Sequence, residues 1–110
     1  MKISDKTYSK MIKYSESFSD QESCGLIYED KEGLNQFKEC KNIHVNPVEF
    51  FEICPNEYLK TSKQGEIKAV FHSHPKSGGP SQMDIQMSTS LEIPFVIYSL
   101  KKKKFYNIGC

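Results

Sequence analysis

The sequence predicts a mixed α/β (α+β) domain in which helices flank a mostly antiparallel sheet. Two pairs of strand-like segments, each separated by a short polar turn at 30–33 and 101–104, predict antiparallel hairpins. Apolar residues recur at helical spacing near the start of the chain and again after residue 81. A chain of 110 residues can bury one core but hardly a second, so we expect a single domain over residues 1–110.

The chain should begin with an amphipathic helix. It is expected over residues 7–18, where the apolar spacing is uneven but roughly helical, and Ser4 or Asp5 can cap it. A short apolar run at 24–28 follows and predicts a buried strand. Gly25 lies within this run, and a glycine at such a place is typical of a strand that another backbone approaches closely.

The middle of the chain predicts a returning strand and a short helix. The strand at 35–42 completes the first hairpin. Pro55 cannot donate a backbone hydrogen bond but fits the first turn of a helix, which should end near residue 63. We expect the buried side of this helix to carry Tyr58 and Leu59.

A central strand and a second long helix should come next. The segment 67–72 is apolar at most positions, which predicts burial on both faces near the centre of the sheet. The helix is expected over 81–91. Met83, Met87 and Leu91 recur at i, i+4 and i+8, so we expect them to form its inward stripe.

The last two strands, at 94–100 and 105–108, should form a hairpin with the lysines 101–104 at its solvated tip. Four like charges in a turn, with a net charge of +1 overall, are a weak footprint for a nucleic-acid or anionic-membrane partner, and we expect neither. The longest apolar run, 93–98, is too short to span a bilayer.

The four cysteines predict free thiols and not a disulfide framework. They are even in number but form no CxxC pair, and the sequence shows no hydrophobic leader. We therefore expect a reducing compartment. The cysteines are Cys24, Cys40, Cys54 and Cys110.

Two histidines near the end of the central strand predict a metal site. Residues two apart on a strand point to the same side, so His72 and His74 can present both imidazoles to one point. Asp84 follows in the first turn of a helix that Ser81 can cap. Two nitrogens and one carboxylate oxygen suit Zn²⁺ and leave a fourth position for water, as in catalytic sites. The plainer alternative is that Ser81 and Asp84 only form a capping box.

A hydrolytic zinc site also needs a general base, and Glu22 is our candidate. It precedes the strand that begins at Cys24, and a carboxylate at that strand edge can project over a neighbouring site. The alternative is an ordinary solvated loop acid. A hydrolase that pairs Cys24 with His72 or His74 is a third possibility, but the apolar neighbours of Cys24 predict a buried, inert thiol.

Together these residues resemble the JAMM motif of the MPN metallopeptidases, which is a distant glutamate, then His-Ser/Thr-His-Pro, a loop, and Ser-x-x-Asp. In this sequence the motif comprises Glu22, His72 to Pro75, Ser81 and Asp84. Six residues separate His74 from Ser81, one fewer than is usual in the family. The flanking sequence is similar to the peptidase domain of phage tail assembly proteins, so the resemblance covers nearly the whole chain.

The resemblance implies an MPN/JAMM-like fold, related to that of cytidine deaminases, and a site with assigned roles. His72, His74 and Asp84 would bind Zn²⁺, Glu22 would activate a water molecule and carry its proton, and Ser81 would stabilise the oxyanion. The implied reaction is hydrolysis of a peptide or isopeptide bond in a protein or peptide substrate. The implied setting is phage tail assembly or a bacterial equivalent, with phage tail proteins as partners, in the bacterial or phage-infected host cytoplasm or on the virion. The alternative is a noncatalytic MPN scaffold.

Overall fold

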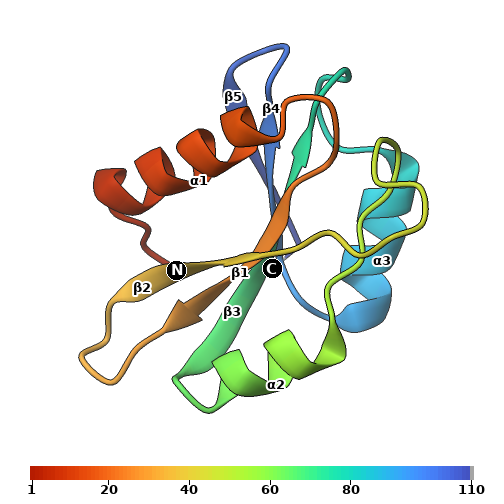
Figure 1. Cartoon of the computed structure of the whole chain (residues 1–110). Helices are drawn as coiled ribbons and strands as arrows, with labels where there is room; N and C mark the ends of the chain where they lie inside the picture. Colours follow the sequence, from red (N-terminus) through yellow and green to blue (C-terminus); the bar gives the residue numbers. More distant parts are fainter. Residues whose placement is uncertain (110) are drawn as a thin grey trace.

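The computed structural model describes residues 1–109, which contain three helices and five strands (Figure 1). In chain order these are α1 (Asp5–Ser17), β1 (Cys24–Glu29), β2 (Asn35–Cys40), α2 (Pro55–Ser62), β3 (Glu66–His74), α3 (Gln82–Leu91), β4 (Phe95–Ser99) and β5 (Lys104–Ile108). The strands form one sheet in the order β2-β1-β3-β4-β5, and every neighbouring pair is antiparallel except β3 and β4. The predicted α+β class is confirmed, and β3 lies at the centre of the sheet as its apolar run predicts.

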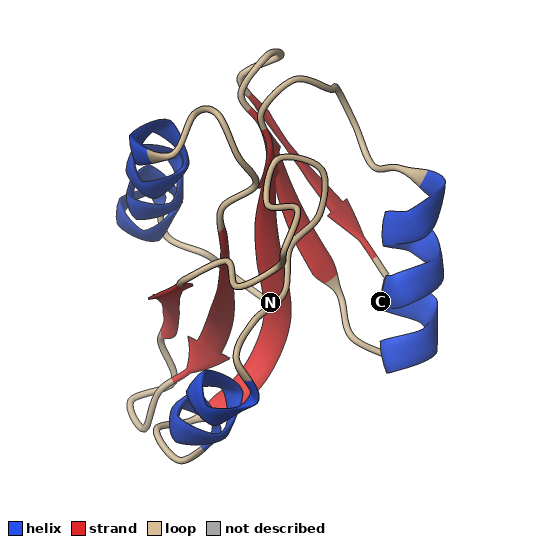
Figure 2. Cartoon of the chain, turned by 45° about the vertical axis from the view of Figure 1, so that its right-hand side comes forward, coloured by secondary structure: helices blue, strands red, loops and turns tan. Residues whose placement is uncertain are grey.

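Helices cover both faces of the sheet, with α1 and α3 on opposite sides (Figure 2). Successive residues of a strand point to opposite faces. Phe71 therefore packs in the core cluster that includes Met11 of α1, whereas Val70 belongs to the cluster that Met87 of α3 covers. His72 lies two residues after Val70 on the same strand, so its imidazole points to the same face of the sheet, the one that α3 covers.

Gly25 lets β2 lie close against β1. A Cβ atom at this position would come 2.5 Å from the carbonyl oxygen of Lys38 and would collide with the ring of Phe37. The predicted close approach of another backbone is therefore confirmed. On its other side β1 pairs with β3, and Cys24 lies opposite His72. This register brings the residues just before β1 to the histidine end of β3.

The predicted buried side of α2 is wrong. Tyr58 and Leu59 are 45% and 55% exposed, and the buried residue of the helix is Thr61. The turn that follows α2 presses Gly65 against the carbonyl of Glu29, where a side chain would collide. This contact holds the end of the helix tightly against β1, and a small threonine fits there.

The predicted inward stripe of α3 is also wrong at two of its three positions. Met83 and Leu91 are 48% and 60% exposed, and Met87 alone packs against the core. The buried residues of α3 are Asp84 and Ser88. The polar contacts of the Asp84 carboxylate and the hydrogen bond from Ser88 Oγ to Ile93 O (2.6 Å) set the rotation of the helix.

The cysteines Cys24, Cys40 and Cys54 carry free thiols, while the expectation for Cys110 lies outside the described residues. Within residues 1–109, no helix has the length and apolar character needed to cross a membrane.

Candidate metal centre

Three buried side chains from two elements converge on one point. His72 and His74 come from the end of β3, and Asp84 comes from the first turn of α3. His72 Nε2 lies 2.9 Å from Asp84 Oδ1, and His74 Nε2 lies 3.1 Å from Asp84 Oδ2. One potential ligand atom from each residue lies within 4.8 Å of the other two, so this group could hold a metal ion.

The imidazole nitrogens of this cluster are short of hydrogen-bond partners. Both ring nitrogens of His72, and Nδ1 of His74, are buried and unpaired within the described residues. Asp84 Oδ1 is close to His72 Nε2 but lies off the direction of a ring N–H. Buried polar atoms without a partner cost free energy. A metal ion bound to the Nε2 atoms would remove part of that cost, so the donor set fits Zn²⁺.

The electrostatics of the cluster also suit a cation. Burial lowers the pKa of His72 and outweighs the opposing effect of Asp84, which keeps the ring neutral as a metal ligand must be. Burial alone would lower the pKa of His74 too, but its contacts with Asp84 raise it. Burial would raise the pKa of Asp84, yet its contacts with the two histidines lower it, so the carboxylate is ionised.

Asp84 forms the capping box of the plainer interpretation and also belongs to the group that could hold a metal. Ser81 Oγ accepts a hydrogen bond from Asp84 N (3.1 Å), and Asp84 Oδ2 accepts one from Ser81 N (2.8 Å), which completes a capping box. The same carboxylate contacts both imidazoles. The hydroxyl of Ser81 accepts in this cap, so its own hydrogen is free to donate into the cleft.

A buried serine network places Glu22 beside the histidines. Ser73 N donates to Ser23 O (2.9 Å), Ser23 N donates to Ser73 Oγ (2.9 Å), and the two hydroxyls lie 2.8 Å apart. These bonds extend the pairing of β1 and β3 beyond the strands' ladder. Glu22 therefore lines the same cleft as His74, Ser81 and Asp84, a cavity of about 450 Å³.

A family comparison identifies the architecture around this site. Residues 4–108 match the family described as prokaryotic homologs of the JAB domain. The chain belongs to this JAB family. The predicted resemblance to JAMM/MPN proteins is thereby confirmed.

This JAB domain is also similar to a curated phage protein, the tail tip assembly protein K of Escherichia phage N15. The two are 26% identical over 95 residues, which cover 86% of this chain and 39% of the relative. The chain thus spans well under half the length of that relative.

Asn42 is a residue of the JAB domain that sequence reasoning missed. Its amide nitrogen donates to the carbonyls of Glu22 (2.8 Å) and Phe50 (2.9 Å), and its Oδ1 accepts from the backbone N–H groups of His44 (3.0 Å) and Glu52 (3.1 Å). One side chain therefore connects Glu22 to the loop whose residues His44 and Phe50 also line the cleft. An asparagine just after a strand gives no signal of this role in the sequence.

The third histidine of the chain, His44, also lines the cleft, and the sequence did not single it out either. The ring of His44 packs against that of Phe50 in a tilted arrangement, with ring centroids 5.2 Å apart, and both residues line the cavity. Its Nδ1 accepts the Asn46 N–H (2.9 Å), so a neutral His44 carries its proton on Nε2.

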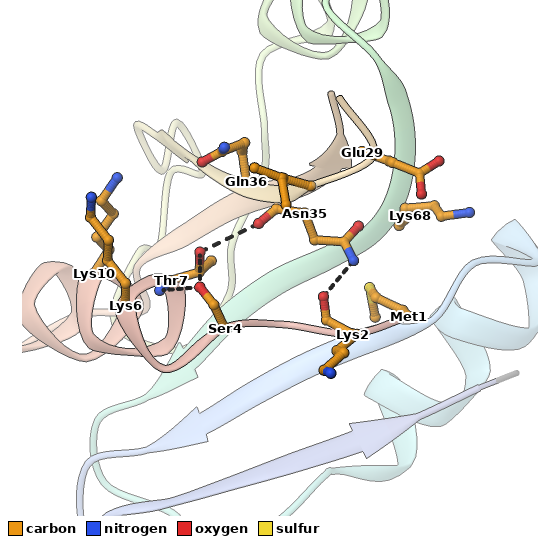
Figure 3. A pocket seen from close by; sticks show the side chains of 12 residues that line it. Met1, Lys2, Ser4, Lys6, Thr7, Lys10, Glu29, Asn35, Gln36 and Lys68 are labelled. Atoms are coloured by element: carbon orange, nitrogen blue, oxygen red, sulfur yellow. Dashed lines mark hydrogen bonds between the residues drawn. The ribbon is translucent and has the colours of Figure 1, made fainter. Parts of the chain in front are cut away.

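A larger cavity than the metal cleft lies elsewhere in the JAB domain and lacks comparable chemistry (Figure 3). It measures about 760 Å³ and is lined by the start of α1 and the β1–β2 hairpin. The close-up shows that the Ser4 and Thr7 hydroxyls hydrogen-bond to each other, that Thr7 Oγ1 donates to the backbone carbonyl of Asn35, and that Asn35 Nδ2 donates to Lys2 O. Among the described residues, Asn35 Oδ1 is buried without a partner. No histidine or cysteine lines this cavity among the described residues.

The protonation of Glu22 leads to a stability prediction for the metal-free protein. Burial raises the pKa of Glu22 from 4.5 to about 8, with His74 opposing the shift and Asp84 adding to it. Stability from the protonated carboxyl is fully present below pH 4.5 and is lost as pH rises through 8. We expect wild type to lose roughly 1–2 kcal/mol more unfolding free energy than Glu22→Gln between pH 5 and pH 9, after allowing for solvent screening.

Urea unfolding of both proteins in EDTA, at pH 5 and pH 9, measures this difference. The glutamine variant is the matched control, because every other titrating group is the same. An equal loss in the two proteins would contradict the raised pKa of the half-buried Glu22.

Proposed function

We propose that this JAB domain is a zinc-dependent hydrolase that cleaves peptide or isopeptide bonds. The observation that supports it most is the cleft that Glu22 shares with His74 and Asp84, two members of the cluster that could hold a metal. A structural zinc site would be closed by a fourth protein ligand. Here the described residues offer three ligands and an open cleft, which leaves room for water and substrate.

Zinc would be held by His72 Nε2, His74 Nε2 and a carboxylate oxygen of Asp84. When bound there, the ion supplies Lewis-acid polarisation of the scissile carbonyl and lowers the pKa of a water molecule. The lowered pKa of His72 and the lowered pKa of Asp84 leave these two side chains ready to bind the ion, whereas His74, whose pKa is raised, would release its proton when the ion binds.

The chain's own residues would then manage the proton and the developing charge. Glu22 would accept a proton from the attacking water and pass it to the leaving amine, since it lines the same cleft as His74 and Asp84. The free hydroxyl hydrogen of Ser81 would donate to the negative charge that develops on the carbonyl oxygen. Asn42 would hold the backbone of Glu22 in place.

The biological setting is proposed from the phage relative. Similarity to a tail tip assembly protein supports a role in phage tail assembly or a bacterial equivalent, with a protein or peptide substrate and phage tail proteins as partners. That role would place the protein in the cytoplasm of a bacterium or infected host, or on the virion.

Cys24 does not make a convincing nucleophile in this arrangement. Burial raises the pKa of its thiol to about 12, and its Sγ donates to Cys40 O at 3.8 Å. A thiol that stays protonated at neutral pH is a poor attacking group.

One experiment separates metal chemistry from thiol chemistry. Zinc-loaded protein is incubated with a mixed peptide library, and the products are read by mass spectrometry. We expect hydrolysis to stop with 1,10-phenanthroline, to return on addition of Zn²⁺, and to persist in Cys24→Ala and after iodoacetamide treatment. Hydrolysis that resists the chelator and is lost in Cys24→Ala would favour the cysteine, while a purified protein with neither zinc nor hydrolysis would be a scaffold.

A further inference from the structure

A second depression, which is apolar, lies beside the metal cleft. It measures about 440 Å³, and its floor consists of Leu26, Val70 and Phe95 from three neighbouring strands. Its rim carries large side chains in solvent, since Tyr58 is 45% and Leu91 60% exposed. Apolar depressions with exposed rims are typical of binding sites, so this groove is a candidate binding site.

The groove is continuous with the metal cleft. Phe51 and Met87 line both. The ring of Phe51 stacks on the imidazole of His72, with centroids 4.4 Å apart and an angle of 18° between the planes. A molecule in the groove would therefore touch the ring that packs directly on a candidate zinc ligand.

The exposed side of α3 forms one wall along both depressions. Met83 lines the metal cleft, Met87 lines both, and Leu91 lines the groove. These are the residues whose spacing predicts an inward stripe; Met83 and Leu91 face the depressions instead of the core, while Met87 lines both depressions and also packs against the core. Methionine is flexible and adapts to varied apolar partners, which suits a recognition surface.

The charges around the groove favour an uncharged occupant. Glu52 is the one charged residue among the described residues that line it, and the rest of the lining is apolar apart from the Tyr58 hydroxyl. A peptide laid along the cleft in extended form advances about 3.3 Å per residue, so the side chains nearest the scissile bond reach the adjoining depression.

We propose that this groove is a substrate subsite that binds a large apolar side chain, aliphatic or aromatic, of the segment next to the scissile bond. The inference rests on the proposed hydrolase function and adds a substrate class to it. Specificity then comes from Tyr58, Leu91 and the two residues that line both depressions, Phe51 and Met87. The metal cluster acts on the backbone of the substrate at the scissile bond.

A binding measurement tests the groove without requiring hydrolysis. Isotope-labelled Glu22→Gln protein, loaded with zinc, is titrated by NMR with acetyl-Gly-Ser-X-Gly-Ser-amide peptides in which X is Leu, Phe, Asp or Gly. We expect the Leu and Phe peptides to bind roughly tenfold more tightly than the other two, because one buried apolar side chain contributes about that much. Methyl signals of Leu91 and Ile93 should shift on binding.

Substitutions at the rim supply matched controls. Tyr58→Ser and Leu91→Ser should each remove most of the preference for Leu and Phe. Leu59→Ser and Ile85→Ser should retain it, because these side chains are 55% and 52% exposed on the same two helices but do not line the groove. All four sites are exposed, so folding should survive.

The outcomes separate this proposal from the hydrolase proposal. Equal or undetectable binding of the four peptides, or equal effects of rim and control variants, would overturn the subsite. So would a dimer that Leu91→Ser disrupts, since the groove would then bind a second copy of the chain. Preferential binding of Leu and Phe peptides that zinc-loaded wild type never cleaves would support the groove and contradict the hydrolase.

Discussion

Replacing Glu22 with glutamine is expected to lower hydrolysis by about 10²–10⁴-fold, because glutamine keeps the shape of the side chain but cannot accept a proton. Glu22 does not belong to the group of His72, His74 and Asp84 that could hold a metal. The variant should therefore keep one zinc ion per chain. Peptide cleavage and metal content, measured on the same preparation, test both halves of this expectation.

Glu49 offers a matched control for that experiment. It lines the same cleft but is exposed, and the proposed chemistry gives it no role. Glu49→Gln should retain most of the wild-type hydrolysis. If Glu22→Gln retained hydrolysis, Glu22 could not be the general base. If that variant lost its zinc, Glu22 would be a metal ligand instead.

Substitutions at Asp84 are expected to have the second large effect, on metal retention. Asp84→Ala removes both the carboxylate and one half of the capping box, so it should lose zinc and also about 1 kcal/mol of stability. Asp84→Asn retains an amide oxygen that can accept from Ser81 N. It should keep most of the helix cap but bind zinc far more weakly, because the ionic ligand is gone.

Ser81→Ala completes the comparison by weakening the cap without touching the proposed ligands. It should cost about 0.5–2 kcal/mol and keep its zinc. Equilibrium dialysis against zinc and urea unfolding of the three variants give the two quantities separately. If Asp84→Asn holds zinc as well as wild type does, Asp84 is only a capping residue.

Much of the architecture follows from local sequence pattern. The hairpins form where polar turns interrupt apolar runs, and β3 is central because its run is apolar on both faces. His72 and His74 converge because residues two apart in a strand point to the same face, which the local sequence is enough to predict. Asp84 lies near them because the capping serine, Ser81, fixes where α3 begins. The shortened loop before Ser81 does not prevent this cap from forming.

The remaining features depend on contacts between distant segments, which local pattern does not encode. Methionine and leucine at helical spacing predict a buried stripe, yet the paired polar contacts of Asp84 rotate α3 so that Met83 and Leu91 face the depressions. The hydrogen bonds of Asn42 reach carbonyls and N–H groups up to 20 residues away. The stacking of Phe51 on His72 likewise exists only in the folded chain.

Anomalous X-ray diffraction at the zinc edge, on crystals of the purified protein, tests the central claim most directly. We expect one zinc peak about 2.0–2.2 Å from His72 Nε2, His74 Nε2 and an oxygen of Asp84, with Glu22 facing the open side. The absence of a metal peak at this cluster in zinc-supplemented crystals, or a peak bound by other residues, would contradict the account.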